Sequence, residues 1–222
     1  MPSLPTFHDP SLLERALTHR SYLNERPELA LEDNERLEFL GDAVLDFVAG
    51  AWLYNRFPEM PEGRLTSLRA ALVKTETLAE FALRVGINEN LRLGRGEAEG
   101  GGRGRISLLA DAFEAVLGAL YLDQGLAAVQ HYLEQLLPAE AERILAEERD
   151  RDAKSVLQEW SQAERGITPR YRTIAEEGPD HAKSFTVEVR IGRQVVGRGE
   201  GLSKQAAAQA AASDALKRLN VF

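Results

Sequence analysis

The sequence contains no cysteine and no long hydrophobic run. Without cysteine, the 222-residue chain can form neither disulfides nor thiolate metal sites, which is typical of a cytoplasmic protein. No run of about eighteen apolar residues is present, so we expect no membrane-spanning helix. Residues 1–13 lack a basic segment followed by a long apolar one, and we therefore expect no signal peptide.

Basic residues are in the minority: 27 Lys and Arg stand against 35 Asp and Glu, for a net charge of −8. Overall acidity argues weakly against nucleic acid as a partner. The excess of acid is confined to residues 1–151, which hold 16 basic and 26 acidic residues, whereas residues 152–222 hold 11 and 9. This asymmetry predicts two units with different functions.

Apolar residues recur at helical spacing through residues 1–148, and no alternating strand pattern is found there. The clearest helical segments are 11–23, 34–57, 65–86 and 107–125. Pro58, Gly86 and Gly125 stand where helices are expected to end. We therefore predict an all-α domain over residues 1–148.

Two further segments have the composition of surface connections. Segment 93–105 is glycine-rich, lacks the Gly-Lys-Ser/Thr ending of a phosphate-binding P-loop and follows no predicted strand. We expect a flexible surface loop there and not a nucleotide cradle. The highly charged segment after Pro138 is expected to form a last helix that runs into a linker at 149–154.

Beyond this linker the pattern changes to a mixture of helix and strand. Helices are expected at 155–166 and 203–219, and strands at 169–177, 184–191 and 193–200. The order α-β-β-β-α predicts a small α+β domain over residues 155–222. Composition alone also allows a protein-interaction domain.

The predicted helix at 34–57 carries four carboxylates on one face. At about 100° per residue they fall within an arc of roughly 80°; they are Glu35, Glu38, Asp42 and Asp46. The core face is expected to consist of Leu37, Leu40, Val44, Leu45, Phe47 and Val48. Like charges at this spacing repel, and a divalent cation such as Mg²⁺ would remove that cost. The alternative is a solvated acidic stripe.

A second pair of acids has the same arrangement in the helix predicted at 107–125. Asp111 and Glu114 lie three residues apart and share a face with small residues such as Gly118, which would let another helix approach closely. Together with Glu38 and Asp42 they would form a four-carboxylate metal site. The pattern alone does not distinguish this metal site from two unrelated acidic stripes.

Four other side chains stand out. Phe39 falls beside the acidic arc and outside the apolar face, so it is either incidental or a contact for a partner subunit or substrate. His8, His19 and His131 lie in plain helical or terminal contexts and are expected to be structural. No Ser/His/Asp arrangement for nucleophilic catalysis is apparent.

The segment NERLEFLGDAVL, at 34–45, resembles the signature of bacterial ribonuclease III. LTHRSYLNE and LLADAFEAVLGALYLDQG occur in the order found in that family. The tail, with GPDHAKSFTVEV and VGRGEGLSKQAAAQAAA, resembles a double-stranded-RNA-binding domain. The resemblance covers nearly the whole chain.

This resemblance implies a Mg²⁺-dependent endonuclease, with Mn²⁺ as a substitute and no nucleotide cofactor. Such an enzyme hydrolyses phosphodiester bonds in double-stranded RNA and leaves 5′-phosphates and short 3′ overhangs. The family expectation is a cytoplasmic homodimer that processes precursor ribosomal and other structured RNAs. Two alternatives stay open: a double-stranded-RNA-binding protein without catalysis, and an all-α nucleoside-triphosphate pyrophosphohydrolase, for which the tail would be unexplained.

The family's functional residues correspond to positions of this chain. Its metal ligands correspond to Glu38, Asp42, Asp111 and Glu114, of which Glu114 is expected to be the ligand most needed. Glu35 and Glu62 match its substrate-positioning and auxiliary acids, and Phe39 matches a residue at the dimer contact. Asp46 matches no such role and is assigned to the surface.

The RNA-binding residues correspond in the same way. They are Gln158, His181, Ser203 and Lys204. The chain departs from the family pattern at Gln205, where a basic residue is usual, and at Ala208, where a charged one is common. One cation fewer predicts weaker binding and a shallower dependence on salt.

Overall fold

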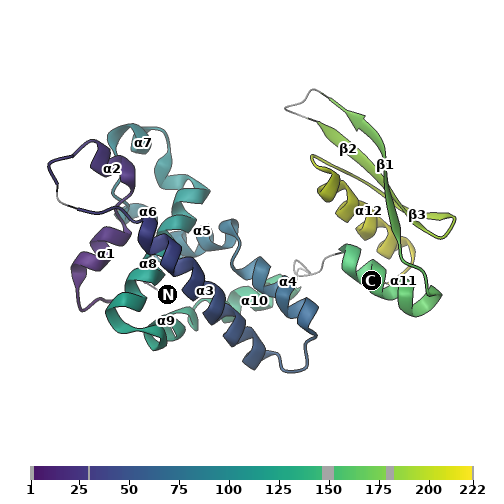
Figure 1. Cartoon of the computed structure of the whole chain (residues 1–222), viewed down its shortest axis with the longest axis horizontal. Helices are drawn as coiled ribbons and strands as arrows, with labels where there is room; N and C mark the ends of the chain where they lie inside the picture. The colour runs from purple at the N-terminus through teal and green to yellow at the C-terminus, as the bar shows by residue number, and fades with distance from the viewer. Residues whose placement is uncertain (1–2, 30, 147–152, 179–182, 222) are drawn as a thin grey trace. The chain divides into compact units, whose positions relative to one another are not determined.

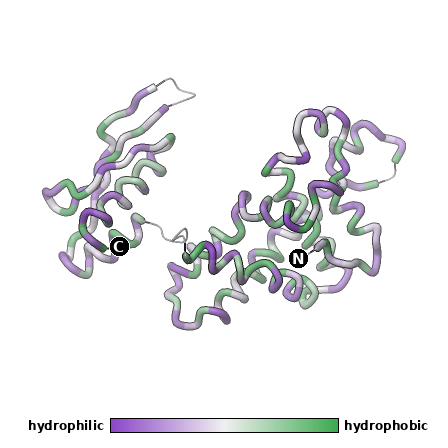
Figure 2. Tube along the Cα trace, turned by 180° about the vertical axis from the view of Figure 1, so that it is seen from behind, coloured by the Kyte–Doolittle hydropathy of each residue, from purple (hydrophilic) through white to green (hydrophobic). Residues whose placement is uncertain are grey.

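The computed structural model describes residues 3–29, 31–146, 153–178 and 183–221. The chain divides into two compact units, Met1–Asp150 and Arg151–Phe222, and each is described by itself (Figure 1). Hydrophilic and hydrophobic residues alternate in short stretches along the helices of both units (Figure 2). None of the described helices is long and apolar enough to cross a membrane.

The first unit is helical, as predicted. Its elements are α1 (Pro10–Ala16), α2 (Arg20–Asn24), α3 (Glu35–Arg56), α4 (Glu62–Leu72), α5 (Thr75–Arg84), α6 (Ile87–Asn90), α7 (Arg95–Glu99), the 3₁₀ turn η1 (Gly102–Gly104), α8 (Ile106–Gln124), α9 (Leu126–Leu133) and α10 (Leu137–Ala146). Helices α3 and α8 form its centre, with α5, α1 and α9 packed against α8. The rings of Phe81 on α5 and Phe113 on α8 lie 5.6 Å apart and are fully buried.

Two of the predicted helical segments are interrupted. Segment 11–23 divides into α1 and α2 because the backbone between them bonds to Arg92 instead of continuing the helix. The amide of Arg92 donates to the carbonyl of Leu17 at 2.8 Å, and the amide of His19 donates to the carbonyl of Arg92 at 3.1 Å. Segment 65–86 divides into α4 and α5. The apolar spacing continues across both breaks, so periodicity alone does not reveal them.

The glycine-rich segment 93–105 is not the flexible loop that we predicted. It contains α7 and η1, and Arg105 forms an ion pair with Glu97 at 2.8 Å. A Cβ atom on Gly94 would lie 2.5 Å from the carbonyl oxygen of Ser21. At least this glycine therefore serves close packing, which composition does not distinguish from flexibility.

Helices α3 and α8 touch through their backbones at two glycines. A Cβ atom on Gly41 would lie 1.8 Å from the carbonyl oxygen of Glu114, and one on Gly118 would lie 2.2 Å from the carbonyl oxygen of Leu37. Real side chains do not approach backbone atoms so closely, so only glycine fits at either position. The close approach that we predicted at Gly118 is confirmed, whereas no sequence pattern singled out Gly41.

This contact also decides which face of α3 is buried. Leu37, Val44, Leu45 and Val48 are buried as predicted. Phe47 is 59% exposed, so its assignment to the core face is wrong. The buried face is centred on Gly41, and Phe47 lies about 120° away from that centre around the helix. Phe39 is 82% exposed, in line with its predicted position outside the apolar face.

The second unit has the predicted order of one helix, three strands and one helix. Its elements are α11 (Ala153–Arg165), β1 (Arg170–Glu177), β2 (Ser184–Ile191), β3 (Gln194–Gly201) and α12 (Lys204–Arg218). Helix α11 begins inside the segment predicted as a linker, 149–154, of which 149–152 lie outside the described residues. The predicted α+β class is confirmed.

The sheet is antiparallel with the order β1-β2-β3, and β1 has a bulge between Thr173 and Ala175. Helix α12 packs on β2 and β3, and α11 packs on α12 (Figure 1). Alanines on α12 lie directly against β3, since a Cβ atom on Gly199 would come within 2.1 Å of the amide of Ala211. Glycine at alternate positions of β3 therefore lets the alanine-rich helix α12 pack closely against the strand.

The glycine contact between α3 and α8 generates a prediction with an internal control. The substitution Gly41→Ala should destabilise the protein by more than about 2 kcal/mol, because a backbone carbonyl must move to admit the new methyl group. Gly50→Ala in the same helix should instead stabilise it by roughly 0.5–1 kcal/mol, since its Cβ would meet only a side chain at 3.8 Å. Chemical denaturation measures both; equal effects of the two variants would contradict the contact.

Candidate active site

Three carboxylates from the two central helices come together. Glu38 of α3 and Asp111 and Glu114 of α8 each offer an oxygen, and these oxygens lie within 4.8 Å of one another. All three side chains are half-buried. The backbone contact sets this spacing. The carbonyl of Glu114 lies against Gly41, and Gly41 is three residues after Glu38 on α3. The structure thus brings together three of the four carboxylates that we predicted to form a site.

Burial and mutual repulsion disfavour the charged forms of these acids. The pKa of Glu114 is raised to about 8, first by burial and then by the charges of Asp42, Glu38 and Asp111. Burial also raises the pKa of Glu38, with Asp111 as the next cause. Burial raises the pKa of Asp111 as well, although the nearby His19 partly opposes the rise. Three such carboxyls are unfavourable neighbours without a cation.

Asp42 and Asp46 lie close to the cluster without belonging to the group of three. Asp42 is exposed, and its charge contributes to the raised pKa of both Glu114 and Glu38. Asp46 is half-buried and makes the smallest of the contributions to the raised pKa of Glu114. Both residues therefore add to the negative potential at Glu114.

Glu35 and His19 adjoin the cluster on the other side. They line a small hollow of about 60 Å³ together with Glu38 and Asp111. Glu35 accepts a hydrogen bond from Arg20 at 3.2 Å. The Nδ1 atom of His19 accepts from the amide of Ser21 at 3.3 Å and so caps α2. The structural role predicted for His19 is present, but its position beside Asp111 was missed, because no spacing rule links residue 19 to residue 111.

Glu62 does not join the cluster within one chain. It begins α4, accepts a hydrogen bond from the Thr66 hydroxyl at 3.0 Å, and shares a hollow with Tyr54 and Asn55 at the far end of α3. Asn55 is 17 residues from Glu38, which is about 25 Å along a helix. The role that the resemblance gives to Glu62 stays a prediction.

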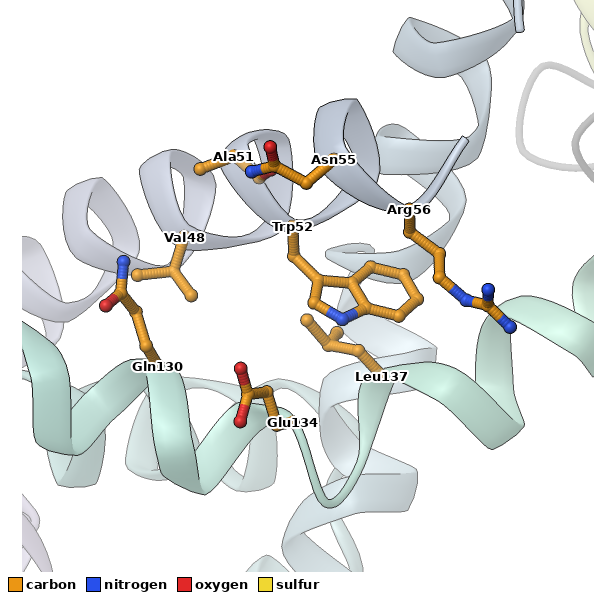
Figure 3. A pocket seen from close by; sticks show the side chains of 8 residues that line it. All are labelled: Val48, Ala51, Trp52, Asn55, Arg56, Gln130, Glu134 and Leu137. Atoms are coloured by element: carbon orange, nitrogen blue, oxygen red, sulfur yellow. The ribbon is translucent and has the colours of Figure 1, made fainter. Parts of the chain in front are cut away.

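Another hollow, of about 390 Å³, lies between the C-terminal half of α3 and the helices α9 and α10 (Figure 3). Its lining consists of Val48, Ala51, Trp52, Asn55, Arg56, Gln130, Glu134 and Leu137. The indole of Trp52 and a single carboxylate, that of Glu134, face it. This lining gathers no group of acids, so the carboxylate cluster is the stronger candidate for chemistry.

In the second unit, three of the four predicted RNA-binding residues lie on exposed helix positions. Gln158 is exposed on α11, and Ser203 caps α12 by accepting a hydrogen bond from the amide of Ala206 at 3.1 Å. Lys204 is the exposed first residue of α12. His181 lies outside the described residues.

The departures at Gln205 and Ala208 differ in their structural meaning. Gln205 is exposed beside Lys204, so a cation there would be accessible. Ala208 is 7% exposed and belongs to the core of the second unit. The effect of both departures on RNA binding stays a prediction.

The donor set of the cluster suits a hard divalent cation. Carboxylate oxygens are the protein ligands that Mg²⁺ takes, and one or two carboxylates commonly suffice beside water and phosphate oxygens. The half-buried oxygens of Glu38, Asp111 and Glu114 are close enough to share one ion. A cation would also remove the repulsion that raises the pKa of Glu114.

Comparisons with known proteins agree with both halves of this description. Residues 9–140 match a family described as Ribonuclease-III-like, and residues 153–219 match the double-stranded RNA binding motif. A curated relative named Ribonuclease 3, from Roseiflexus sp. (strain RS-1), is 52% identical over 96% of this chain and 91% of its own length.

The chain belongs to the ribonuclease III family. Another Ribonuclease 3, from Enterococcus faecalis, is 47% identical over 96% of this chain and 92% of its own length. The predicted enzyme class, an endoribonuclease for double-stranded RNA, is confirmed by this membership. The alternative of an unrelated pyrophosphohydrolase is thereby set aside.

Solved structures similar to this chain include a nuclease domain and a chain of about the same length. The nuclease domain of ribonuclease III from Campylobacter jejuni is 38% identical, with a TM-score of 0.55, and covers 61% of this chain and 90% of that chain. Dicer from Pichia stipitis is 32% identical, with a TM-score of 0.50, and covers 97% of both chains. The helical unit is thus the nuclease domain of the family.

The raised pKa of Glu114 predicts how the stability of the metal-free protein depends on pH. The folded protein holds this proton up to about pH 8, whereas the unfolded chain releases it near the ordinary value of 4.5. Stability therefore falls as pH rises through this window. Glu114→Gln removes that loss, so its Tm should exceed that of the wild type at pH 8 by at least about 2–4 °C, and match it near pH 4.5.

Thermal melting in a chelating buffer checks this expectation. Glu89→Gln removes an exposed carboxylate on α6 and serves as the control, because its Tm should track the wild type. Added Mg²⁺ should raise the Tm of the wild type more than that of Glu114→Gln. A constant difference between Glu114→Gln and wild type across the pH range would exclude the buried, protonated carboxyl.

Proposed function

We propose that Glu38, Asp42, Asp111 and Glu114 hold Mg²⁺ and that this site hydrolyses phosphodiester bonds in double-stranded RNA. The observation that carries the proposal is the meeting of three half-buried carboxylate oxygens within 4.8 Å at the crossing of α3 and α8. Asp42, exposed one residue after Gly41, contributes its charge to the same site. Mn²⁺ is the expected substitute.

A phosphodiester is anionic and repels a hydroxide nucleophile. Mg²⁺, when bound, supplies positive charge to the phosphate and lowers the pKa of bound water. The protein's own contribution is to fix the carboxylates through a backbone contact that side-chain motion cannot relax. Glu114 must release its proton before both of its oxygens serve as ligands, so affinity for the cation should fall as pH decreases below about 8.

Glu35 fits a role in positioning the substrate. Its carboxylate adjoins the cluster, and the exposed Arg20 pairs with it at 3.2 Å. An arginine beside the site can contact an RNA phosphate, while Glu35 holds the guanidinium in place. For Glu62, we propose the auxiliary role that the resemblance implies.

In the second unit, Gln158, His181, Ser203 and Lys204 are proposed to contact RNA. Double-stranded RNA is recognised by shape, through 2′-hydroxyls in the minor groove and through phosphates. Gln158 suits hydroxyls, whereas Lys204 suits phosphates. The products are expected to carry 5′-phosphates and short 3′ overhangs, and the natural substrates to be precursor ribosomal and other structured RNAs in the cytoplasm.

Cleavage assays test the site. The purified protein should cut a long RNA duplex only when Mg²⁺ or Mn²⁺ is present, and should leave single-stranded RNA and duplex DNA intact. Glu114→Ala and Asp42→Asn should each lose activity by about 100-fold or more while still binding the duplex. The control on the same helix is Asp46→Asn, which should stay within about 3-fold of wild type, the size of a modest field effect.

If Asp46→Asn loses as much activity as Asp42→Asn, the assignment of Asp42 as a metal ligand and of Asp46 as a mere neighbour is wrong. Binding of the duplex without cleavage in either metal would show a binding protein that lacks a working site.

We further propose a homodimer built around Phe39. The solved Campylobacter jejuni nuclease domain is described as having flexibility in a region involved in dimer formation. Here Phe39 is 82% exposed beside a hollow of about 510 Å³, and Leu122 next to it is 55% exposed. In a two-fold dimer each subunit offers the same patch, so Phe39 of one chain would enter the hollow of the other.

Removal of this side chain should weaken the dimer. Phe39→Ala deletes an exposed ring and should raise the dimer dissociation constant by at least about 10-fold, the effect of a residue at the centre of an interface. Sedimentation over a range of concentrations measures the change. Leu83→Ala, which removes a 50% exposed side chain on α5, should leave the dissociation constant unchanged. Equal behaviour of the two variants would place the interface elsewhere.

A further inference from the structure

Lys204, the proposed phosphate contact on α12, is already paired with a carboxylate of its own domain. Its Nζ lies 2.8 Å from Oε1 of Glu176 on β1. The Nζ of Lys183, the residue directly before β2, lies 3.8 Å from Oε2 of the same glutamate. One carboxylate thus bridges two ammonium groups through both of its oxygens, as the anionic oxygens of a phosphate would.

The strand register explains why this glutamate, and not its neighbour, reaches the lysines. Glu176 is paired across the sheet with Phe185, and the Nζ of Lys204 lies 5.5 Å from the centre of the Phe185 ring. Successive residues of a strand point to opposite faces, so Glu177 points away from Lys204. Within the described part of the chain, no ion pair is found for Glu177.

The charge of Glu176 responds to this environment. The hydrogen bond from Lys204 is the largest cause that holds the pKa of Glu176 below its usual range, and the charge of Lys183 acts in the same direction. Glu176 is therefore ionised whenever the domain meets RNA at neutral pH. RNA that contacts Lys204 must therefore displace the carboxylate of Glu176 from it.

We propose that Glu176 limits the affinity of the domain for double-stranded RNA by competing with phosphate for Lys204. This inference rests on the proposed role of Lys204 as an RNA contact. Glu176 lowers the effective number of phosphates that the domain neutralises, and so it weakens both the binding and its dependence on salt. Glu176 is one of the nine acids that leave residues 152–222 with only a small excess of positive charge, and it lies beside the proposed RNA contact.

The expected size of the effect follows from exposure. The side chains of Lys204 and Glu176 are 62% and 38% exposed, so the pair is weak and screened by salt. Removal of the carboxylate should therefore tighten RNA binding by only roughly two- to five-fold at low salt. The gain should shrink as salt rises, because the binding slope steepens by up to about one unit when one more phosphate is neutralised.

The experiment uses the full chain in a chelating buffer, where no divalent cation supports cleavage. Fluorescence anisotropy with a labelled RNA duplex gives Kd from about 50 to 300 mM salt. Glu176→Gln is compared with Glu177→Gln, which removes the same charge from the adjacent residue of the same strand. Only Glu176→Gln should show the two- to five-fold gain, and circular dichroism should show both variants folded.

A double-mutant cycle with Lys204→Gln decides whether Glu176 acts through Lys204. If it does, Glu176→Gln has no effect on Kd in the Lys204→Gln background. Equal gains from Glu176→Gln and Glu177→Gln, or a gain that persists without Lys204, would overturn the inference while the RNA-binding function stands. Failure of the wild type to bind the duplex, or an unchanged Kd in Lys204→Gln, would instead overturn the proposed RNA contact itself.

Discussion

The backbone contact between α3 and α8 is the constraint on which the rest of the nuclease domain depends. At Gly41 and Gly118 each helix lies against a carbonyl oxygen of the other, with no side chain between them. Glu38, three residues before Gly41, and Glu114, four residues before Gly118, are therefore held close together. They are carboxylates on both sides, which is electrostatically unfavourable in a half-buried place. The helical core overcomes this repulsion, and the result is a site that attracts cations.

The residues of this site could be selected from the sequence because helical periodicity is regular. Glu38 on one helix, and Asp111 with Glu114 on another, share a face by their spacing alone, and the absence of nearby cations distinguishes them from ordinary surface acids. The order of helices and strands followed from the same regularity. Family resemblance was needed for Glu62 and for the RNA-binding residues, which no spacing rule selects.

The features that the sequence did not reveal are those that depend on tertiary contacts. By spacing alone Phe47 belongs to the core face of α3. The contact with α8 instead centres the buried face on Gly41, which leaves Phe47 exposed. His19 meets Asp111 only because the chain between α1 and α2 is held by Arg92. The pairing of Glu176 with Lys204 depends on a bulge that shifts the register of β1. Each of these features depends on which segments lie next to one another in space. The local sequence pattern does not contain that information.

The same bulge, between Thr173 and Ala175, has a consequence for the behaviour of the protein at high concentration. A three-stranded sheet leaves the outer edges of β1 and β3 open, and open edges are templates for aggregation. The bulge breaks the regular ladder of β1, and Arg170 and Arg172 place charge along it. Strand-to-strand association between copies of this domain is thereby disfavoured.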